Sequence, residues 1–140
     1  MKKILVCLIG AASALAFAGT EFKNVPEPMH KPLSNHSLKT AQLDQGVLRV
    51  QVDKPVLTEL VYASFIFNGI CAEKWRNPAR FASLALTRVE VLDASATHGF
   101  AFDARGDVCD EMGIMGKNVR TLINAHTVPC NASACQQQHP

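Results

Sequence analysis

The N-terminal eighteen residues constrain this chain more than any other feature, because residues 1–18 have all three parts of a secretory signal. A lysine pair is followed by an apolar stretch over residues 4–15 and by small residues at the first and last positions of 16–18. We expect cleavage between Ala18 and Gly19. The apolar run is shorter than the roughly 20 residues that a membrane-spanning helix needs, so no permanent membrane anchor is expected.

Removal of this signal changes both the size and the charge of the chain. About 120 residues remain, which is enough for one domain with its own core. Of the 14 Lys and Arg residues, Lys2 and Lys3 lie in the signal, which leaves 12 basic and 12 acidic residues. A neutral chain with dispersed cations lacks the basic face of a nucleic-acid-binding protein. We therefore expect a periplasmic or secreted protein with no nucleic-acid partner.

Four cysteines follow the signal: Cys71, Cys109, Cys130 and Cys135. An even number of cysteines in an oxidising compartment predicts two disulfides, for which three pairings are possible. The short spacing favours a local bridge from Cys130 to Cys135, which leaves Cys71 and Cys109 to join distant parts of the core. Because no CxxC motif occurs, a thioredoxin-like dithiol is not expected.

The first half of the mature chain predicts a flexible segment followed by a folded domain. Residues 19–45 are rich in Pro, Asn, His and Ser, which is typical of a lead-in without fixed structure, and the domain is expected over 46–140. Residues 47–52 are rich in β-branched side chains and predict a strand. A helix is expected over 53–65, with Asp53 as its N-cap. The alternative is a strand that runs into a hairpin turn at Asn68-Gly69.

The second half predicts a hairpin and a further helix. After an irregular connection near residues 74–78, residues 83–92 alternate with a phase shift that indicates a bulged strand, and the hairpin is expected over 83–103. Asp107 is expected to cap a short helix. Residues 122–128 are expected to form a closing strand. The fold class predicted is a small single α+β domain, disulfide-bonded, with a mostly antiparallel sheet packed by one or two helices.

Candidate catalytic residues can be nominated, but no spacing singles them out. The sequence has no GxSxG, SxxK or HExxH motif. A cysteine nucleophile would need a histidine base and an orienting carboxylate, and hydrolysis of peptidoglycan would need paired carboxylates. The nominated groups are Cys71 or Cys109 with His98 or His126 and Asp103 or Asp107, and separately Glu59, Glu73, Asp110 and Glu111. No catalytic residue is assigned from these sets.

The sequence gives little support for a metal site or an adhesion motif. Cys130, Cys135 and His139 have a spacing loosely like part of a zinc site, but a fourth ligand is missing locally and the cysteines are expected to be oxidised. His30 and His36 lie in the predicted lead-in. We therefore predict no metal and no cofactor. The tripeptide at 105–107 reads Arg-Gly-Asp, which chance and the helix-capping role of Asp107 explain.

The best functional lead in the sequence is Trp75, the only tryptophan. Its neighbours Lys74, Arg76 and Arg80 give it the composition of a protein-binding hot spot, although such a residue can also cover a core. With Tyr62 as an extension, we predict a binding surface of Trp75, Arg76, Arg80 and Tyr62. The function expected is that of an exported, non-enzymatic protein that binds another macromolecule of the cell envelope, as an inhibitor or immunity-type partner. The alternatives are a small cell-envelope hydrolase and a periplasmic metal-binding protein.

Overall fold

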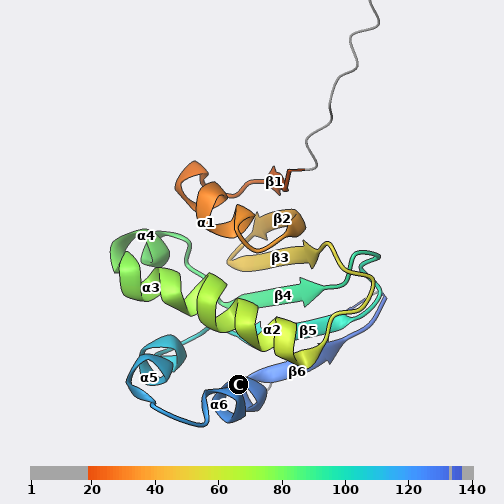
Figure 1. Cartoon of the computed structure of the whole chain (residues 1–140). Helices are drawn as coiled ribbons and strands as arrows, with labels where there is room; N and C mark the ends of the chain where they lie inside the picture. The colour runs from red at the N-terminus through yellow and green to blue at the C-terminus, as the bar shows by residue number, and fades with distance from the viewer. Residues whose placement is uncertain (1–18, 133, 137–140) are drawn as a thin grey trace, which may run out of the picture.

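Six strands form one sheet in the computed structural model of the chain, which describes residues 19–132 and 134–136. Their order in the sheet equals their order in the sequence (Figure 1). The strands are β1 (Glu21–Lys23), β2 (Leu38–Asp44), β3 (Val47–Val52), β4 (Arg88–Leu92), β5 (Gly99–Asp103) and β6 (Thr127–Cys130).

Helices fill most of the connections between these strands. The β1–β2 and β3–β4 pairs are parallel and are each joined through helices, as a parallel pair requires, whereas the other three pairs are antiparallel. The predicted small α+β domain with a mostly antiparallel sheet is thus confirmed. The helical elements are η1 (Glu27–Met29), α1 (His30–Ser34), α2 (Glu59–Phe65), the π-helical η2 (Ile66–Cys71), α3 (Ala72–Arg76), α4 (Pro78–Ser83), α5 (Val108–Ile114) and α6 (Val119–Ala125).

The elements α2, η2 and α3 follow one another without a break, and their start differs from the predicted one. The N-cap is Thr58, whose Oγ1 accepts a hydrogen bond from the Val61 amide at 3.2 Å, so Asp53 is not the cap. The alternative strand and turn at Asn68-Gly69 is wrong, because η2 carries the helical path through these residues. The path ends at Asn77, because the residue before Pro78 is sterically pushed out of the helical region.

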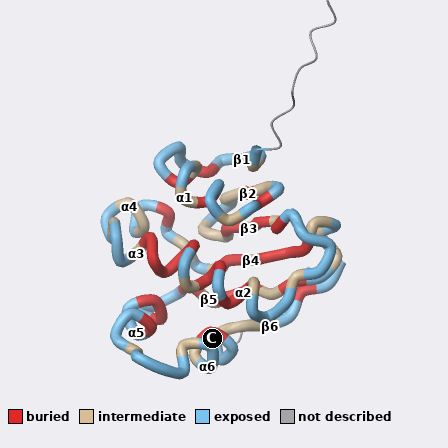
Figure 2. Tube along the Cα trace, in the orientation of Figure 1, coloured by how far each residue is buried: buried red, intermediate tan, exposed pale blue. Residues whose placement is uncertain are grey.

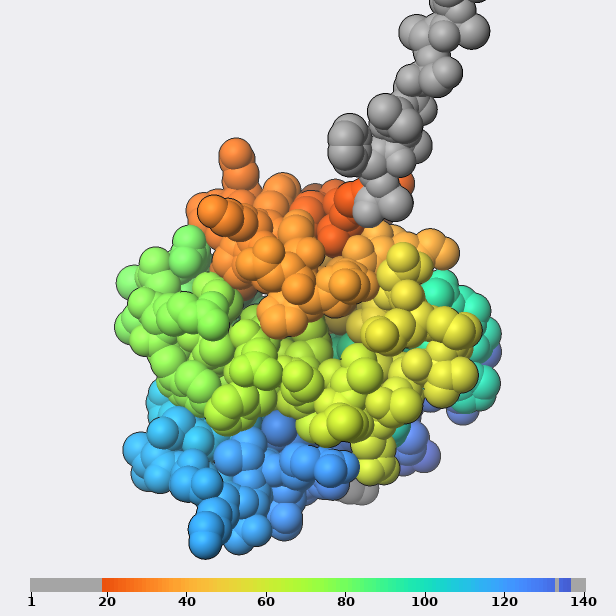
Figure 3. Space-filling model, viewed as in Figure 1, coloured from red at the N-terminus to blue at the C-terminus, as the bar shows by residue number. Residues whose placement is uncertain are grey.

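The core lies between the helices and one face of the sheet. Side chains alternate along β3, as predicted, so that every second residue is buried (Figure 2). Figure 3 shows the outside of this helical layer, where the run from α2 to α4 forms a band between the N-terminal segment and the C-terminal helices. The core side chains of the strands include Leu48, Val50, Val52, Val89, Val91 and Phe102, and those of the helical run include Tyr62, Phe65, Ile66 and Ile70.

The predicted hairpin is present but shorter than expected. Strands β4 and β5 pair in register from Arg88 opposite Asp103 to Leu92 opposite Gly99, with no bulge. The apolar phase shift before Val89 marks the passage from α4 into β4. The predicted closing strand over 122–128 is largely the helix α6, and β6 starts at Thr127. The expected irregular connection near 74–78 is likewise helical, with its one break at Asn77.

The prediction of a flexible lead-in is wrong, because residues 19–45 contribute strands β1 and β2 and the helical elements η1 and α1 to the domain. Prolines hid the helical part of this segment, since Pro26 precedes η1 and Pro32 lies within α1. Strand β2 turns into β3 through Gln45 and Gly46, both with positive φ, as in a type I′ hairpin. The buried side chains from this segment are Val25, Met29, Leu33, Leu38 and Ala41.

Two disulfides are present, and they have the favoured pairing. Cys71 is bonded to Cys109 over a sequence separation of 38, and Cys130 is bonded to Cys135 over a separation of 5. The predicted signal and cleavage site at residues 1–18 lie outside the described residues. Within the residues that the structure describes, no helix has both the length and the apolarity needed to cross a bilayer.

Candidate functional site

The side chain of Trp75 lies between two helices at the surface. Its indole Nε1 donates a hydrogen bond of 2.9 Å to the carbonyl oxygen of Cys109 in α5. Phe67 of η2 meets the indole edge-on, with ring centroids 5.1 Å apart. The residue is 37% exposed, so the ring is anchored at its polar edge and still open to solvent.

The two walls around Trp75 are held together by several independent links. The Cys71–Cys109 disulfide joins the end of η2 to α5, and Lys74 Nζ lies 2.8 Å from Asp110 Oδ2. Gly113 allows a close approach, because a Cβ at this position would lie 3.0 Å from the indole Nε1. The position of Trp75 is therefore built into the fold and does not depend on a partner.

Beside Trp75 the surface is hollowed to a volume of about 550 Å³. Most of the side chains around this hollow are apolar, and Ile114 at its border is 88% exposed. Met115, which is partly exposed, adds a flexible and polarisable side chain, whereas Met112 is 1% exposed and belongs to the core beneath the hollow. The residues that line this surface, called the Trp75 hollow below, are Phe67, Trp75, Asp110, Met112, Gly113, Ile114 and Met115.

The two predicted arginines do not surround Trp75, because they turn to Glu73 instead. Glu73 is 3% exposed, and its Oε1 lies 2.6 Å from Arg76 Nη1, while its Oε2 lies 3.6 Å from Arg80 Nη2. Arg80 also donates to the carbonyl oxygen of Pro28 at 3.4 Å. The carboxylate therefore ties α3 to α4, and Arg80 reaches the N-terminal segment.

Tyr62 is buried and does not line the Trp75 hollow, so it does not extend the surface around Trp75 as the sequence predicts. It is only 1% exposed and packs on Phe100 of β5 with ring centroids 4.8 Å apart. Its hydroxyl lies 2.6 Å from Thr127 Oγ1, and burial raises the pKa of the phenol far above its ordinary value. The residue faces the sheet because α2 turns this side inward.

The nominated nucleophile set lacks its nucleophile. Cys71 and Cys109 are bonded to each other, so neither can provide a thiolate. Asp103 and His126 do lie close, since the Asp103 amide donates to the His126 carbonyl oxygen at 2.8 Å. The Asp103 carboxylate, however, binds Arg105 at 2.7 Å, and this interaction lowers the pKa of Asp103.

Three of the four nominated carboxylates have cationic partners rather than one another. Besides the Glu73 and Asp110 pairs described above, Glu59 Oε2 lies 3.9 Å from Arg120 Nη2 across α2 and α6. Glu111 is exposed on α5. These groups are not brought into one acid–base pair by the contacts described.

The candidate metal ligands are committed elsewhere or lie outside the described residues. Cys130 and Cys135 are bonded to each other, and His139 is beyond the residues that the structure describes. His30 stacks on Phe22 with ring centroids 3.9 Å apart, and burial lowers the pKa of His36. Among residues 19–132 and 134–136, no three His, Cys, Asp or Glu side chains are arranged to hold a metal ion.

The tripeptide at 105–107 has a structural role. Arg105 is engaged by Asp103, and Asp107 precedes the first turn of α5 without a capping bond from its side chain. The predicted helix after Asp107 is therefore confirmed as α5, but the predicted capping bond is absent from it.

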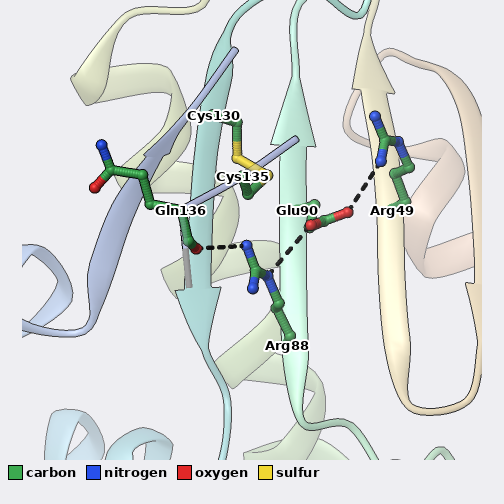
Figure 4. The surroundings of a disulfide bond; sticks show 6 residues. All are labelled: Arg49, Arg88, Glu90, Cys130, Cys135 and Gln136. Carbon is green, nitrogen blue, oxygen red and sulfur yellow. Dashed lines mark hydrogen bonds and ion pairs between the residues drawn. A yellow bond between two sulfur atoms is a disulfide. The ribbon is translucent and has the colours of Figure 1, made fainter. Parts of the chain in front are cut away.

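A second group of residues lies on the face of the sheet opposite the helices, and the sequence prediction missed it. Glu90 of β4 sits between two arginines, with Arg49 Nη1 and Arg88 Nε each 3.2 Å from one of its oxygens (Figure 4). Arg88 Nη2 also donates to the Gln136 carbonyl oxygen at 3.1 Å. The alternation in residues 47–52 and 88–92 was the available signal, because it places these charges on one face.

Comparisons of the chain with protein-family models, with curated proteins and with solved structures find no match in any of the three.

Proposed function

We propose that this chain is an exported, non-enzymatic protein that binds another protein of the cell envelope through the Trp75 hollow, as an inhibitor or immunity-type partner. The observation that carries the proposal is an anchored, partly exposed indole next to an 88% exposed isoleucine around one hollow. Large apolar side chains at a preformed surface are the usual hot spots of protein interfaces. The two disulfides are compatible with the exported location.

The chemistry of the hollow indicates what the partner presents. The walls are aromatic, aliphatic and thioether groups, and the one acidic lining residue, Asp110, is paired with Lys74. This local neutrality favours an apolar side chain over a charged group. We therefore expect a protein loop or helix that inserts a large aromatic or aliphatic residue beside Trp75. Because the disulfide and Gly113 preset the walls, little ordering free energy is lost on binding.

The test is capture from the envelope fraction with wild-type and variant protein, followed by measurement of Kd with the captured protein. Ile114→Ala is the cleanest variant, because an 88% exposed side chain contributes little to folding. We expect Trp75→Ala and Ile114→Ala each to weaken binding at least fivefold, about 1 kcal/mol. Val56→Ala, which removes a 69% exposed aliphatic side chain outside the hollow, is the matched control and should change Kd less than twofold.

Circular dichroism of each variant separates loss of binding from loss of fold. The proposal fails if no protein is captured specifically, or if a folded Ile114→Ala variant binds the captured protein as tightly as the wild type.

A further inference from the structure

The chain after β6 folds back over the face of the sheet that the helices leave open. Cys135 is bonded to Cys130 at the end of β6, and the Gln136 amide donates to the Pro129 carbonyl oxygen at 3.1 Å. The Gln136 carbonyl oxygen in turn accepts from Arg88 of β4 (Figure 4). We call residues 134–136 the tail segment.

The tail segment covers an apolar patch on an otherwise polar face. Leu92 and Ala101 point away from the main core, and both are 0% exposed because Cys130 and Cys135 pack over them with Ala96 and Val128. The neighbouring positions on this face are the charged residues Arg88 and Glu90. Leu92, Ala101 and the disulfide above them thus form a small second core that depends on the tail segment.

The two disulfides differ in access. Cys71 is 0% and Cys109 2% exposed, within the main core. Cys130 is 6% exposed and Cys135 lies partly at the surface. Since thiol–disulfide exchange needs a thiolate to reach a sulfur atom in line with the S–S bond, an external reductant meets the Cys130–Cys135 bridge first.

We propose that Cys130–Cys135 is a redox-exchangeable clasp, reduced by dithiols while Cys71–Cys109 stays intact, and that its reduction releases the tail segment from the Leu92–Ala101 patch. A thiolate of the dithiol attacks Cys135 Sγ, the Cys130 sulfur leaves and takes up a proton, and the second thiol resolves the mixed disulfide. The bridge gains two electrons and two protons, and the dithiol becomes a disulfide.

After reduction, the described hydrogen bonds that hold Gln136 are those to Pro129 and Arg88, and the Arg88 bond is solvent-exposed. Without the disulfide, these two hydrogen bonds protect the tail segment only weakly against hydrogen exchange. The Trp75 hollow is built on the other disulfide and is unaffected, so the clasp is independent of the function proposed above.

The test is titration of the folded protein with dithiothreitol, followed by alkylation and mass spectrometry of each cysteine. We expect Cys130 and Cys135 to be alkylated at concentrations that leave Cys71 and Cys109 bonded. At that point, hydrogen exchange of the Gln136 amide should rise at least tenfold, while the emission of the sole tryptophan stays unchanged.

Two variants keep the proposal falsifiable. Cys130→Ser with Cys135→Ser should reproduce the fast Gln136 exchange without reductant. Arg88→Gln, which removes the hydrogen bond to Gln136 and the ion pair with Glu90 but keeps the bridge, should raise it by less than threefold. Reduction of Cys71–Cys109 at the same or lower dithiothreitol concentration overturns the proposal. An unchanged Gln136 exchange rate in the double serine variant does so as well.

Discussion

Asp93 organises the turn between β4 and β5 as a buried carboxylate. It is 3% exposed, and its Oδ1 accepts hydrogen bonds from the Thr97 amide at 2.9 Å and from the Ser95 hydroxyl at 3.0 Å. The Thr97 amide is the main cause that holds the pKa of Asp93 below its ordinary value, and it outweighs the opposite effect of burial. The charged form is therefore the one that the folded loop stabilises.

This arrangement predicts how stability depends on pH. Because the folded pKa of Asp93 is lowered, the unfolded chain binds more protons in acid, so this stabilisation is present above the ordinary pKa of about 3.9 and is lost as the pH falls below it. We expect urea unfolding between pH 6 and about 2.5 to show a shallower acid loss in Asp93→Asn than in the wild type.

Thr97→Val is the matched variant for this measurement. It deletes the hydroxyl contact and keeps the Thr97 amide, so most of the acid dependence of the wild type should remain. Equal slopes for Asp93→Asn and the wild type would show that this carboxylate is not stabilised by the fold.

Single residues were predictable only where their surroundings are local in sequence. Trp75 stood out by its type, and its partial exposure fits either of the roles considered. Its partner Cys109 is 34 residues away, however, so the anchoring hydrogen bond could not be anticipated. Tyr62 was misplaced because the helical spacing of Leu57, Leu60 and Val61 predicts the wrong buried face. Leu60 is in fact 63% exposed, whereas Tyr62 and Phe65 are buried.

At the scale of elements, the β2–β3 hairpin depends on one glycine for two separate reasons. Gly46 has a φ of +81°, and a Cβ there would lie 2.6 Å from the carbonyl oxygen of Ala85. Gly106 has a similar φ of +70° but no atom within 4 Å of such a Cβ. Comparison of the two positions therefore separates two costs of adding a side chain. Both glycines carry the cost of a left-handed backbone conformation, and only Gly46 adds a steric clash.

Chemical denaturation of two alanine variants tests this separation. We expect Gly106→Ala to cost about 1 kcal/mol, the usual penalty for a left-handed conformation, and Gly46→Ala to cost at least about 2 kcal/mol because the backbone must also move. Equal losses in the two variants would mean that the Ala85 carbonyl adjusts freely.

Elements were predictable where one face of a strand or helix is buried and the pattern is long enough. Strand β3 and helix α5 satisfy this condition. Residues 19–45 do not, because β1, η1 and α1 are only three to five residues long and have prolines among them. Strand β2 is seven residues long and has no proline, but its buried and exposed positions do not alternate strictly. Strand β4 was extended too far, because Leu84 and Leu86 in the connection between α4 and β4 resemble the alternation of a strand.

At the scale of the whole molecule, the two disulfides should differ in how much they stabilise the fold. Loop-closure entropy grows with the length of the closed loop, so the separation of 38 residues predicts about 4 kcal/mol for Cys71–Cys109, and the separation of 5 predicts about 2 kcal/mol for Cys130–Cys135. Unfolding of Cys71→Ala/Cys109→Ala and of Cys130→Ala/Cys135→Ala in urea measures both. A larger loss in the second variant would contradict the loop-length argument.

The order of the sheet also bears on how the chain can assemble as it emerges N-terminus first. Each strand that appears finds the preceding one at an open edge, so no later strand has to be inserted between two that are already paired. Hydrogen bonding can therefore proceed in the direction of synthesis. The two disulfides can also form in sequence order. Cys109, the partner of Cys71, appears before β6, and the Cys130–Cys135 bridge closes last, at the final edge of the sheet.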